Sequence, residues 1–182
     1  MQSLDKFIYI RDGFLSTEEC KNIIKTYDYN LTSLGDPCNY EFKDLENLPF
    51  MKIIHDKLQE VFEEYKKQNS EVDLTTSYWG LKHLRLKKFQ PDYCFGEFHS
   101  EVSISTPFRL LNVQIYLTTH NCGTEFYNGE VIKSEKGRVT IFPAYFTHTH
   151  RGQVCPEKKV RYLLGGYVEF TERGILERKC GD

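Results

Sequence analysis

The chain has 182 residues, 40% hydrophobic and 27% charged, which is ordinary for one soluble globular domain. Its 24 Lys and Arg residues against 26 Asp and Glu residues give a net charge of −2, which argues against a dedicated nucleic-acid-binding protein. No apolar run approaches the roughly 18 residues of a membrane span, and Met1–Gly13 lacks an apolar secretory stretch. We therefore expect a cytoplasmic protein that has no membrane partner.

The amino-terminal part of the chain predicts a short strand, a helix and a loop. Phe7–Ile10 has strand character. Ser16-Thr17-Glu18-Glu19 is a capping box, in which Ser16 and Glu19 satisfy each other's backbone N–H groups, so a helix should run from here to about Tyr27. The stretch 30–47 is rich in Asn, Asp, Gly and Pro, which predicts a loop.

A second helix is predicted to start near Pro49, since proline is favoured at the first helical position. Seven apolar residues follow helical spacing on one face and should form core: Phe50, Ile53, Ile54, Leu58, Val61, Phe62 and Tyr65.

After Ser70 the hydrophobic period changes from helical to alternating. Examples are Leu84 and Leu86, Val113 to Leu117, Val139 and Ile141, and Val160 to Leu164. We expect roughly eight short strands between Ser77 and Phe170 and no further long helix, as in a β-sandwich or barrel. The prediction is one α+β, mainly β domain over 1–182, with a helical support over 1–75 and a β core over 76–170.

The six cysteines do not predict a metal-binding module. No two have the Cys-x-x-Cys spacing, and no Cys pair accompanies a suitably spaced His pair, which argues against a zinc ribbon or finger. In a reducing compartment we expect weak thiols that pack as small hydrophobic groups, without a disulfide framework. They are Cys20, Cys38, Cys94, Cys122, Cys155 and Cys180.

Two short histidine motifs carry the chemical signal. On an extended strand, His99 and Glu101 project to the same face, and His148 or His150 from a facing strand could supply a third ligand. Two imidazoles and one carboxylate leave coordination positions open, as in non-haem Fe(II) oxygenases. A His-x-Glu pair alone is equally compatible with a solvated strand. Phosphate-binding glycine loops and a Gly-x-Ser-x-Gly nucleophile motif are absent from the sequence.

An ordered series of motifs gives these histidines a context. It starts with Phe14-Leu15-Ser16 and Glu19-Cys20, and continues with Lys88-Phe89, Gly96–Glu101, Tyr116-Leu117, Gly123–Phe126, Lys136–Arg138, Phe142-Pro143, His148–Gly152 and Arg161-Tyr162. With these motifs the chain resembles the prolyl 4-hydroxylase-like group of 2-oxoglutarate and Fe(II)-dependent dioxygenases. The resemblance implies a double-stranded β-helix, or jelly roll, for the core.

The resemblance also implies site roles. His99, Glu101 and His150 match the family's iron ligands, and Arg161 with Tyr116 matches the residues that hold the distal carboxylate of 2-oxoglutarate. His150 is preferred to His148 because its spacing of eleven positions to Arg161 fits the family better than thirteen. His148 would then support the ligands or line the pocket.

Charge considerations support a cation at the position of Arg161. Fe²⁺ with one carboxylate ligand and doubly negative 2-oxoglutarate leaves one negative charge in a water-poor barrel, and a buried uncompensated charge is costly. An arginine can grip a carboxylate with two parallel hydrogen bonds. Lys158 and Lys159 are competing cations, and a surface arginine on a strand is the alternative interpretation of Arg161.

Three positions depart from the family pattern. Glu101 is a ligand where aspartate is commoner, Thr118 stands where asparagine is frequent, and Phe89 stands where many relatives have tyrosine. Outside the motifs, His55, His83 and His120 should lie at the surface. The segment Ser103–Phe108, rich in Ser, Thr and Pro, is predicted to be mobile over the site.

The expected function is therefore that of a dioxygenase with Fe(II), 2-oxoglutarate and O₂, for which ascorbate is an allowed auxiliary reductant. It would hydroxylate an unactivated C–H bond, by resemblance that of a prolyl residue in a protein or peptide, and act as a monomer or weak homodimer. Two alternatives stay open: a same-fold oxygenase acting on a free amino acid or other small molecule, and a non-catalytic metal-binding jelly roll.

Overall fold

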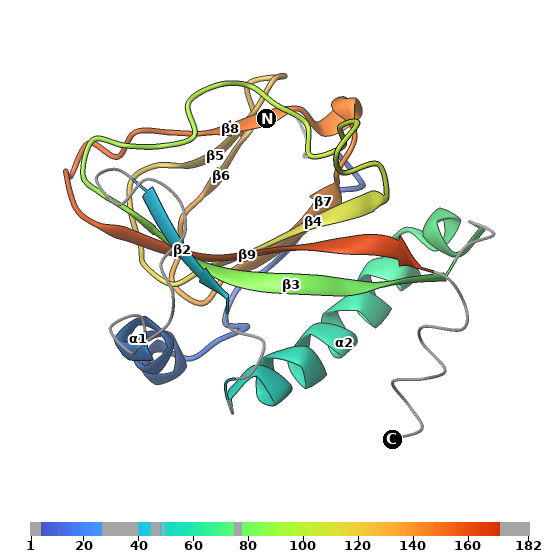
Figure 1. Cartoon of the computed structure of the whole chain (residues 1–182), viewed down its shortest axis with the longest axis horizontal. Coiled ribbons are helices and arrows are strands. Elements are labelled where there is room, and N and C mark those ends of the chain that lie inside the picture. Colours follow the sequence, from blue (N-terminus) through green and yellow to red (C-terminus); the bar gives the residue numbers. More distant parts are fainter. Residues whose placement is uncertain (1–4, 27–39, 45–47, 49, 75–77, 172–182) are drawn as a thin grey trace.

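Two antiparallel sheets face each other in the computed structural model, which describes residues 5–26, 40–44, 48, 50–74 and 78–171 (Figure 1). The larger sheet has the strand order β1-β7-β4-β9-β3-β2 and the smaller one β6-β5-β8. The strands are β1 (Tyr9–Arg11), β2 (Tyr40–Asp44), β3 (Tyr78–Phe89), β4 (Arg109–Tyr116), β5 (Gly123–Phe126), β6 (Val131–Lys133), β7 (Val139–Pro143), β8 (His150–Gly152) and β9 (Arg161–Thr171). This architecture confirms the predicted α+β, mainly β jelly roll.

Two helices cover the outer face of the larger sheet (Figure 1). In α1 (Thr17–Lys25) the predicted capping box is present: the Glu19 N–H donates to Ser16 Oγ at 3.2 Å, and the Ser16 N–H donates to Glu19 Oε2 at 2.7 Å. The second helix is α2 (Phe50–Gln68), followed by a 3-10 turn at Ser70–Leu74. The main core lies between the helices and the sheet and includes Ile54, Leu58, Val61, Leu84, Leu86, Val113, Ile141 and Leu164.

The space between the two sheets holds a smaller apolar cluster, formed by Ile8, Tyr116, Phe126, Ile132 and Phe142. Because this cluster fills only part of the interior, polar side chains line the remaining space. The jelly roll thus has a dry core on its helix-covered side and a polar cavity between its sheets.

The amino-terminal part contributes more than helical support, which corrects the prediction for 1–75. Strand β1, which starts two residues later and ends one residue later than predicted, pairs with β7, and β2 pairs with β3 in the register Tyr40↔Phe89 to Asp44↔Arg85. The predicted loop 30–47 was therefore wrong at residues 40–44, where alternating Tyr40-Glu41-Phe42-Lys43 forms an edge strand. The rest of that loop and Tyr27 lie outside the described residues.

Smaller differences concern the strand count and the apolar stripe of α2. Residues 78–171, all described, contain seven strands where roughly eight were predicted. Ile53 is 55% exposed while Met51 is buried. The buried face of α2 runs through Met51, Ile54 and Leu58, and Ile53 lies outside it. No helix among the described residues combines the length and hydrophobicity needed to cross a membrane.

One pair of cysteines contradicts the prediction of scattered thiols. Cys122, between β4 and β5, and Cys155, between β8 and β9, form a disulfide. Two turns 33 residues apart in sequence meet here, which spacing alone did not indicate. Cys20 and Cys94 are free thiols, and Cys38 and Cys180 lie outside the described residues.

Candidate metal centre and adjoining pocket

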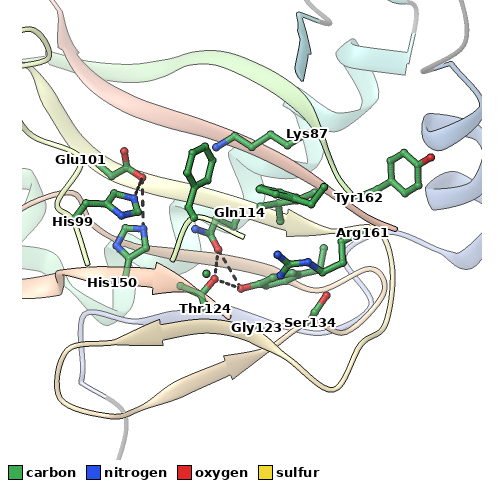
Figure 2. A pocket seen from close by; sticks show the side chains of 15 residues that line it. Lys87, His99, Glu101, Gln114, Gly123, Thr124, Ser134, His150, Arg161 and Tyr162 are labelled. Carbon is green, nitrogen blue, oxygen red and sulfur yellow. Dashed lines mark hydrogen bonds and ion pairs between the residues drawn. The ribbon is translucent and has the colours of Figure 1, made fainter. Parts of the chain in front are cut away.

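The structure brings His99, Glu101 and His150 together at one end of the cavity (Figure 2). The backbones of His99 and His150 form an isolated antiparallel bridge with two N–H···O bonds of 3.0 Å. Their Nε2 atoms lie 3.9 Å and 3.5 Å from Glu101 Oε1, respectively. The donor atoms of the three residues all lie within 4.8 Å of one another. We call this group the triad.

Both imidazoles of the triad are oriented by backbone carbonyls. His99 Nδ1 lies 2.8 Å from the carbonyl oxygen of Glu97, and His150 Nδ1 lies 3.0 Å from that of His148. A carbonyl only accepts, so each Nδ1 carries a proton, which leaves Nε2 as the nitrogen that faces Glu101 and can bind a metal. Metal-binding histidines are commonly oriented in this way.

Glu101 is held by three side chains, none of which the sequence singled out. Asn112 Nδ2 donates to Oε1 at 2.6 Å and the Tyr167 hydroxyl to Oε2 at 2.9 Å, while Arg109 Nη1 lies 3.3 Å from Oε2. Burial by itself raises the pKa of Glu101, but the hydrogen bond to His150, the charge of Lys87 and the Tyr167 hydroxyl outweigh it and hold the pKa at about 2. Glu101 is therefore an anion at neutral pH.

The triad fits a divalent first-row metal. With metal–ligand bonds of about 2.1 Å, ligands at right angles lie about 3 Å apart, so the observed 3.5 Å and 3.9 Å separations would shorten by less than about 1 Å on metal binding. Two neutral imidazoles and one carboxylate form the facial set typical of Fe(II) in oxygenases. The rest of the coordination sphere would face the cavity, so the site can admit further ligands.

Arg161 lies at the other end of the same cavity, which encloses about 580 Å³ with its open mouth included, and Tyr116 also lines this cavity (Figure 2). Arg161 stacks on the Phe89 ring at 4.9 Å and donates to the Tyr93 carbonyl at 3.3 Å. Burial lowers the pKa of Arg161, but a guanidinium keeps its charge in proteins. Burial also raises the pKa of Tyr116 to about 12, so its hydroxyl is a neutral donor.

Polar side chains between the two ends were not anticipated from the sequence. Gln114 Oε1 accepts from the hydroxyls of Tyr116 at 3.1 Å and Thr124 at 2.7 Å. Lys87 extends between the triad and Arg161, and no described residue forms a hydrogen bond or ion pair with its amine (Figure 2). Burial lowers the pKa of Lys87, partly offset by the charge of Glu101. Lys87 lies two positions before Phe89 on the same strand, so both side chains point to the same face. This alternation could have predicted that Lys87 lines the cavity.

The other candidate histidines lie apart from the triad. His148 ends a 3-10 turn (Phe146–His148) and lines a separate cavity with Asp5, Ile8 and Phe126. The expectation that both histidines lie on one regular strand and project to the same side was therefore wrong. His120 is only 7% exposed, so the prediction that it lies at the surface was wrong. His55 is exposed, and the side chain of His83 lies outside the described part of the chain.

The competing cations and the predicted mobile segment also have definite places. Lys158 and Lys159 are exposed and do not line the cavity. The segment Ser103–Phe108 follows the triad motif as a turn, in which Thr106 Oγ1 donates to the Glu101 carbonyl at 2.8 Å. None of its residues lines the cavity, and its mobility stays a prediction.

Comparison with solved structures defines the class of fold. A viral collagen prolyl hydroxylase of Paramecium Bursaria Chlorella virus-1, solved as a 2OG complex, matches with a TM-score of 0.66 at 19% identity, over 91% of this chain and 97% of that one. A Trichoplax adhaerens prolyl hydroxylase in complex with a hypoxia inducible factor peptide matches with a TM-score of 0.67 at 13% identity, over 97% and 88%.

A third match is a Pseudomonas putida prolyl-4-hydroxylase, with a TM-score of 0.63 at 11% identity, over 92% of this chain and 94% of that one. No protein-family model and no curated protein sequence matches the chain. The chain therefore has the jelly-roll fold of the 2OG-Fe(II) oxygenases, in the form found in prolyl hydroxylases.

Proposed function

We propose that the protein is an Fe(II)- and 2-oxoglutarate-dependent dioxygenase that hydroxylates an unactivated C–H bond. The observation that carries the proposal is the placement of a two-histidine, one-carboxylate triad and a partly buried arginine at opposite ends of one cavity. A plain metal-binding jelly roll has no need of a guanidinium facing that cavity. The fold shared with prolyl hydroxylases supports the same assignment.

In this proposal His99, Glu101 and His150 would hold Fe(II), and Arg161 with Tyr116 would hold the distal carboxylate of 2-oxoglutarate. When bound, the metal and the keto acid supply the oxidation of the C–H bond by O₂, with release of succinate and carbon dioxide. The Glu97 and His148 carbonyls orient the imidazoles through their Nδ1–H groups. The Tyr116 hydroxyl, which donates to Gln114 Oε1 in the structure, would instead donate a hydrogen bond to the carboxylate, and Arg161 would neutralise the anion.

Aromatic rings beside Arg161 and His150 limit the access of water to the reacting groups. Phe89 packs under the guanidinium of Arg161, and Phe126 and Phe142 pack against the ring of His150 at centroid distances of 6.0 Å and 4.9 Å. Electrostatic contacts are stronger in such a water-poor site. Asn112, Arg109 and Tyr167 keep the Glu101 carboxylate in one position.

The proposed substrate is a prolyl residue of a protein or peptide, which is what the structurally similar enzymes are named for. An open cleft next to the triad offers a place for a chain segment, and aromatic residues line it: Tyr93, Phe95 and Tyr167.

A small molecule with an acidic group is the second candidate, and Lys87 favours it. Arg161 alone balances the charge that Fe²⁺, Glu101 and 2-oxoglutarate leave, so a protonated Lys87 adds one positive charge. This cation lines both the cavity and the open cleft, where a substrate carboxylate would neutralise it. A free amino acid has such a carboxylate.

The test is succinate formation from 2-oxoglutarate with Fe(II), measured with proline-containing peptides and with free amino acids as separate panels. Stimulation by a peptide, with hydroxyproline found by mass spectrometry, supports the prolyl substrate. Stimulation by amino acids alone, lost in Lys87→Met, supports the second candidate. If the Fe(II)-loaded wild type makes no more succinate than His150→Ala in any panel, the dioxygenase proposal fails.

A further inference from the structure

A second cluster of metal-binding side chains lies beyond Arg161, between two turns. His120 and Cys122 belong to the connection between β4 and β5, and Cys155 and Glu157 to the connection between β8 and β9. Donor atoms of His120, Cys155 and Glu157 all lie within 4.8 Å of one another. The sulfur of Cys122 is bonded to that of Cys155, so it adjoins the same group.

His120 gives an independent indication that this cluster has a ligand. Its side chain is 7% exposed, and neither ring nitrogen has a hydrogen-bond partner of good geometry among the described residues; the Val160 backbone makes only a weak contact with the ring. Buried polar groups in native proteins nearly always have a partner, and a bound ion can supply one where the protein itself does not. Burial and the nearby charge of Arg161 both lower the pKa of His120, so the ring is neutral and offers a lone pair.

We propose that His120, Cys122, Cys155 and Glu157 bind a zinc ion when the Cys122–Cys155 disulfide is reduced. Two thiol groups of a reductant supply the two electrons and two protons that convert the disulfide into two thiols, and the reductant leaves as its own disulfide. Zn²⁺ then displaces the thiol protons to solvent. Two cysteines, one histidine and one carboxylate provide the four ligands of a closed tetrahedral zinc site.

Neighbouring groups suit the charge of such a site. Zn²⁺ with two thiolates and one carboxylate carries one net negative charge. Arg161 Nη1 lies 3.6 Å from Cys122 Sγ and can donate to that sulfur, which compensates the charge. Glu157 Oε1 accepts from the Asn121 N–H at 2.7 Å, which orients the carboxylate and leaves Oε2 to bind the metal. None of the triad residues is a ligand of this zinc site, and Arg161, which the proposed function assigns to 2-oxoglutarate, is only its neighbour.

The test uses Co(II) as a spectroscopic substitute for zinc in the full chain, stripped of metal with a chelator and reduced under anaerobic conditions. Thiolate–cobalt bonds give a charge-transfer absorption that imidazole and carboxylate ligands do not give, so the triad is silent in this measurement. We expect one equivalent of Co(II) to produce the band and one equivalent of Zn(II) to abolish it. Protein with the disulfide intact should give no band.

Matched variants locate the ligands. Cys155→Ser should abolish the band, whereas Cys94→Ser, which removes a free thiol outside the cluster, and His99→Ala, which disables the triad, should keep it. Glu157→Gln is a mild change at an exposed side chain, and it should weaken Co(II) binding at least about tenfold, since even residues that only orient ligands contribute this much. Absence of the band in the reduced wild type overturns the proposal. So does its persistence in Cys155→Ser, or an unchanged affinity in Glu157→Gln.

Discussion

The two ends of the cavity are built in different ways. The triad end consists of short, irregular segments: His99 and Glu101 lie outside the named strands, and β8, which carries His150, has three residues. The other end is built on long paired strands, with Tyr116 in β4 opposite Leu163 of β9, two residues beyond Arg161. Triad geometry therefore depends on side-chain and backbone contacts made locally, whereas the placement of Arg161 depends on strand register.

The two ends also differ in charge. Glu101 makes the triad end anionic, so it attracts a metal, while Arg161 makes the opposite end cationic, so it attracts a carboxylate. Lys87 lies between them (Figure 2). A cavity with this polarity would suit an elongated anion that reaches from a metal at the triad to the guanidinium. Substitutions at one end should therefore affect metal and anion binding separately.

The largest expected effect is the loss of metal binding in His150→Ala, because one of three ligands disappears. Calorimetric titration with Mn(II) should show one site in the wild type and none in this variant. His148→Ala is the matched control and should keep a measurable fraction of binding, since its side chain lines another cavity. If the two variants exchange outcomes, the third ligand is His148.

The next largest effect is expected from Arg161→Ala, on anion binding and not on metal binding. Removing one partner of a buried charge pair costs about 3–5 kcal/mol, so the Kd for 2-oxoglutarate should rise by roughly two to three orders of magnitude. Arg161→Lys should restore only part of the binding, because lysine keeps the positive charge but cannot form two parallel hydrogen bonds with the carboxylate. Titration of Mn(II)-loaded protein without oxygen measures this, with the exposed Lys159→Ala as control. An unchanged Kd in Arg161→Ala would contradict the polarity of the cavity.

The low pKa of Glu101 predicts a pH-dependent stability of the metal-free protein. A carboxyl whose pKa is depressed on folding stabilises the protein above its unfolded pKa, and this contribution is lost as the pH falls toward about 2. As the pH falls from the ordinary pKa of a glutamate to about 2, the wild type should lose unfolding free energy that Glu101→Gln does not lose. The difference between the two proteins should be on the order of 3 kcal/mol. Urea unfolding of both proteins across this range measures the difference, and parallel pH profiles would show that Glu101 is not depressed.

The smallest effect is expected from Tyr116→Phe, which removes one hydroxyl from the arginine end. One hydrogen bond to a charged group contributes about 1–3 kcal/mol, so 2-oxoglutarate binding should weaken by roughly one to two orders of magnitude. Mn(II) binding should stay the same, and the exposed Tyr127→Phe should behave as the wild type. A loss of metal binding in Tyr116→Phe would mean that the two ends are not independent.

Local patterns in the sequence determined much of this protein. The capping box at Ser16 and the apolar stripe of α2 specify helices through contacts only a few residues apart, and both are present in the structure. Alternation specified most strands of the jelly roll, because side chains on a strand point to opposite faces in turn. The His-x-Glu spacing predicted that His99 and Glu101 lie together, which they do, although neither belongs to a named strand.

Tertiary structure decided what depends on contacts between distant segments. The 3-10 turn ending at His148 breaks the strand, so that His150 and not His148 lies beside Glu101. Residues 40–44, which lie in a stretch with loop composition, form strand β2 because they pair with β3. The meeting of Cys122 with Cys155, and the burial of His120 beside them, arise because two turns far apart in the chain pack together, and no spacing rule within one segment can express that proximity.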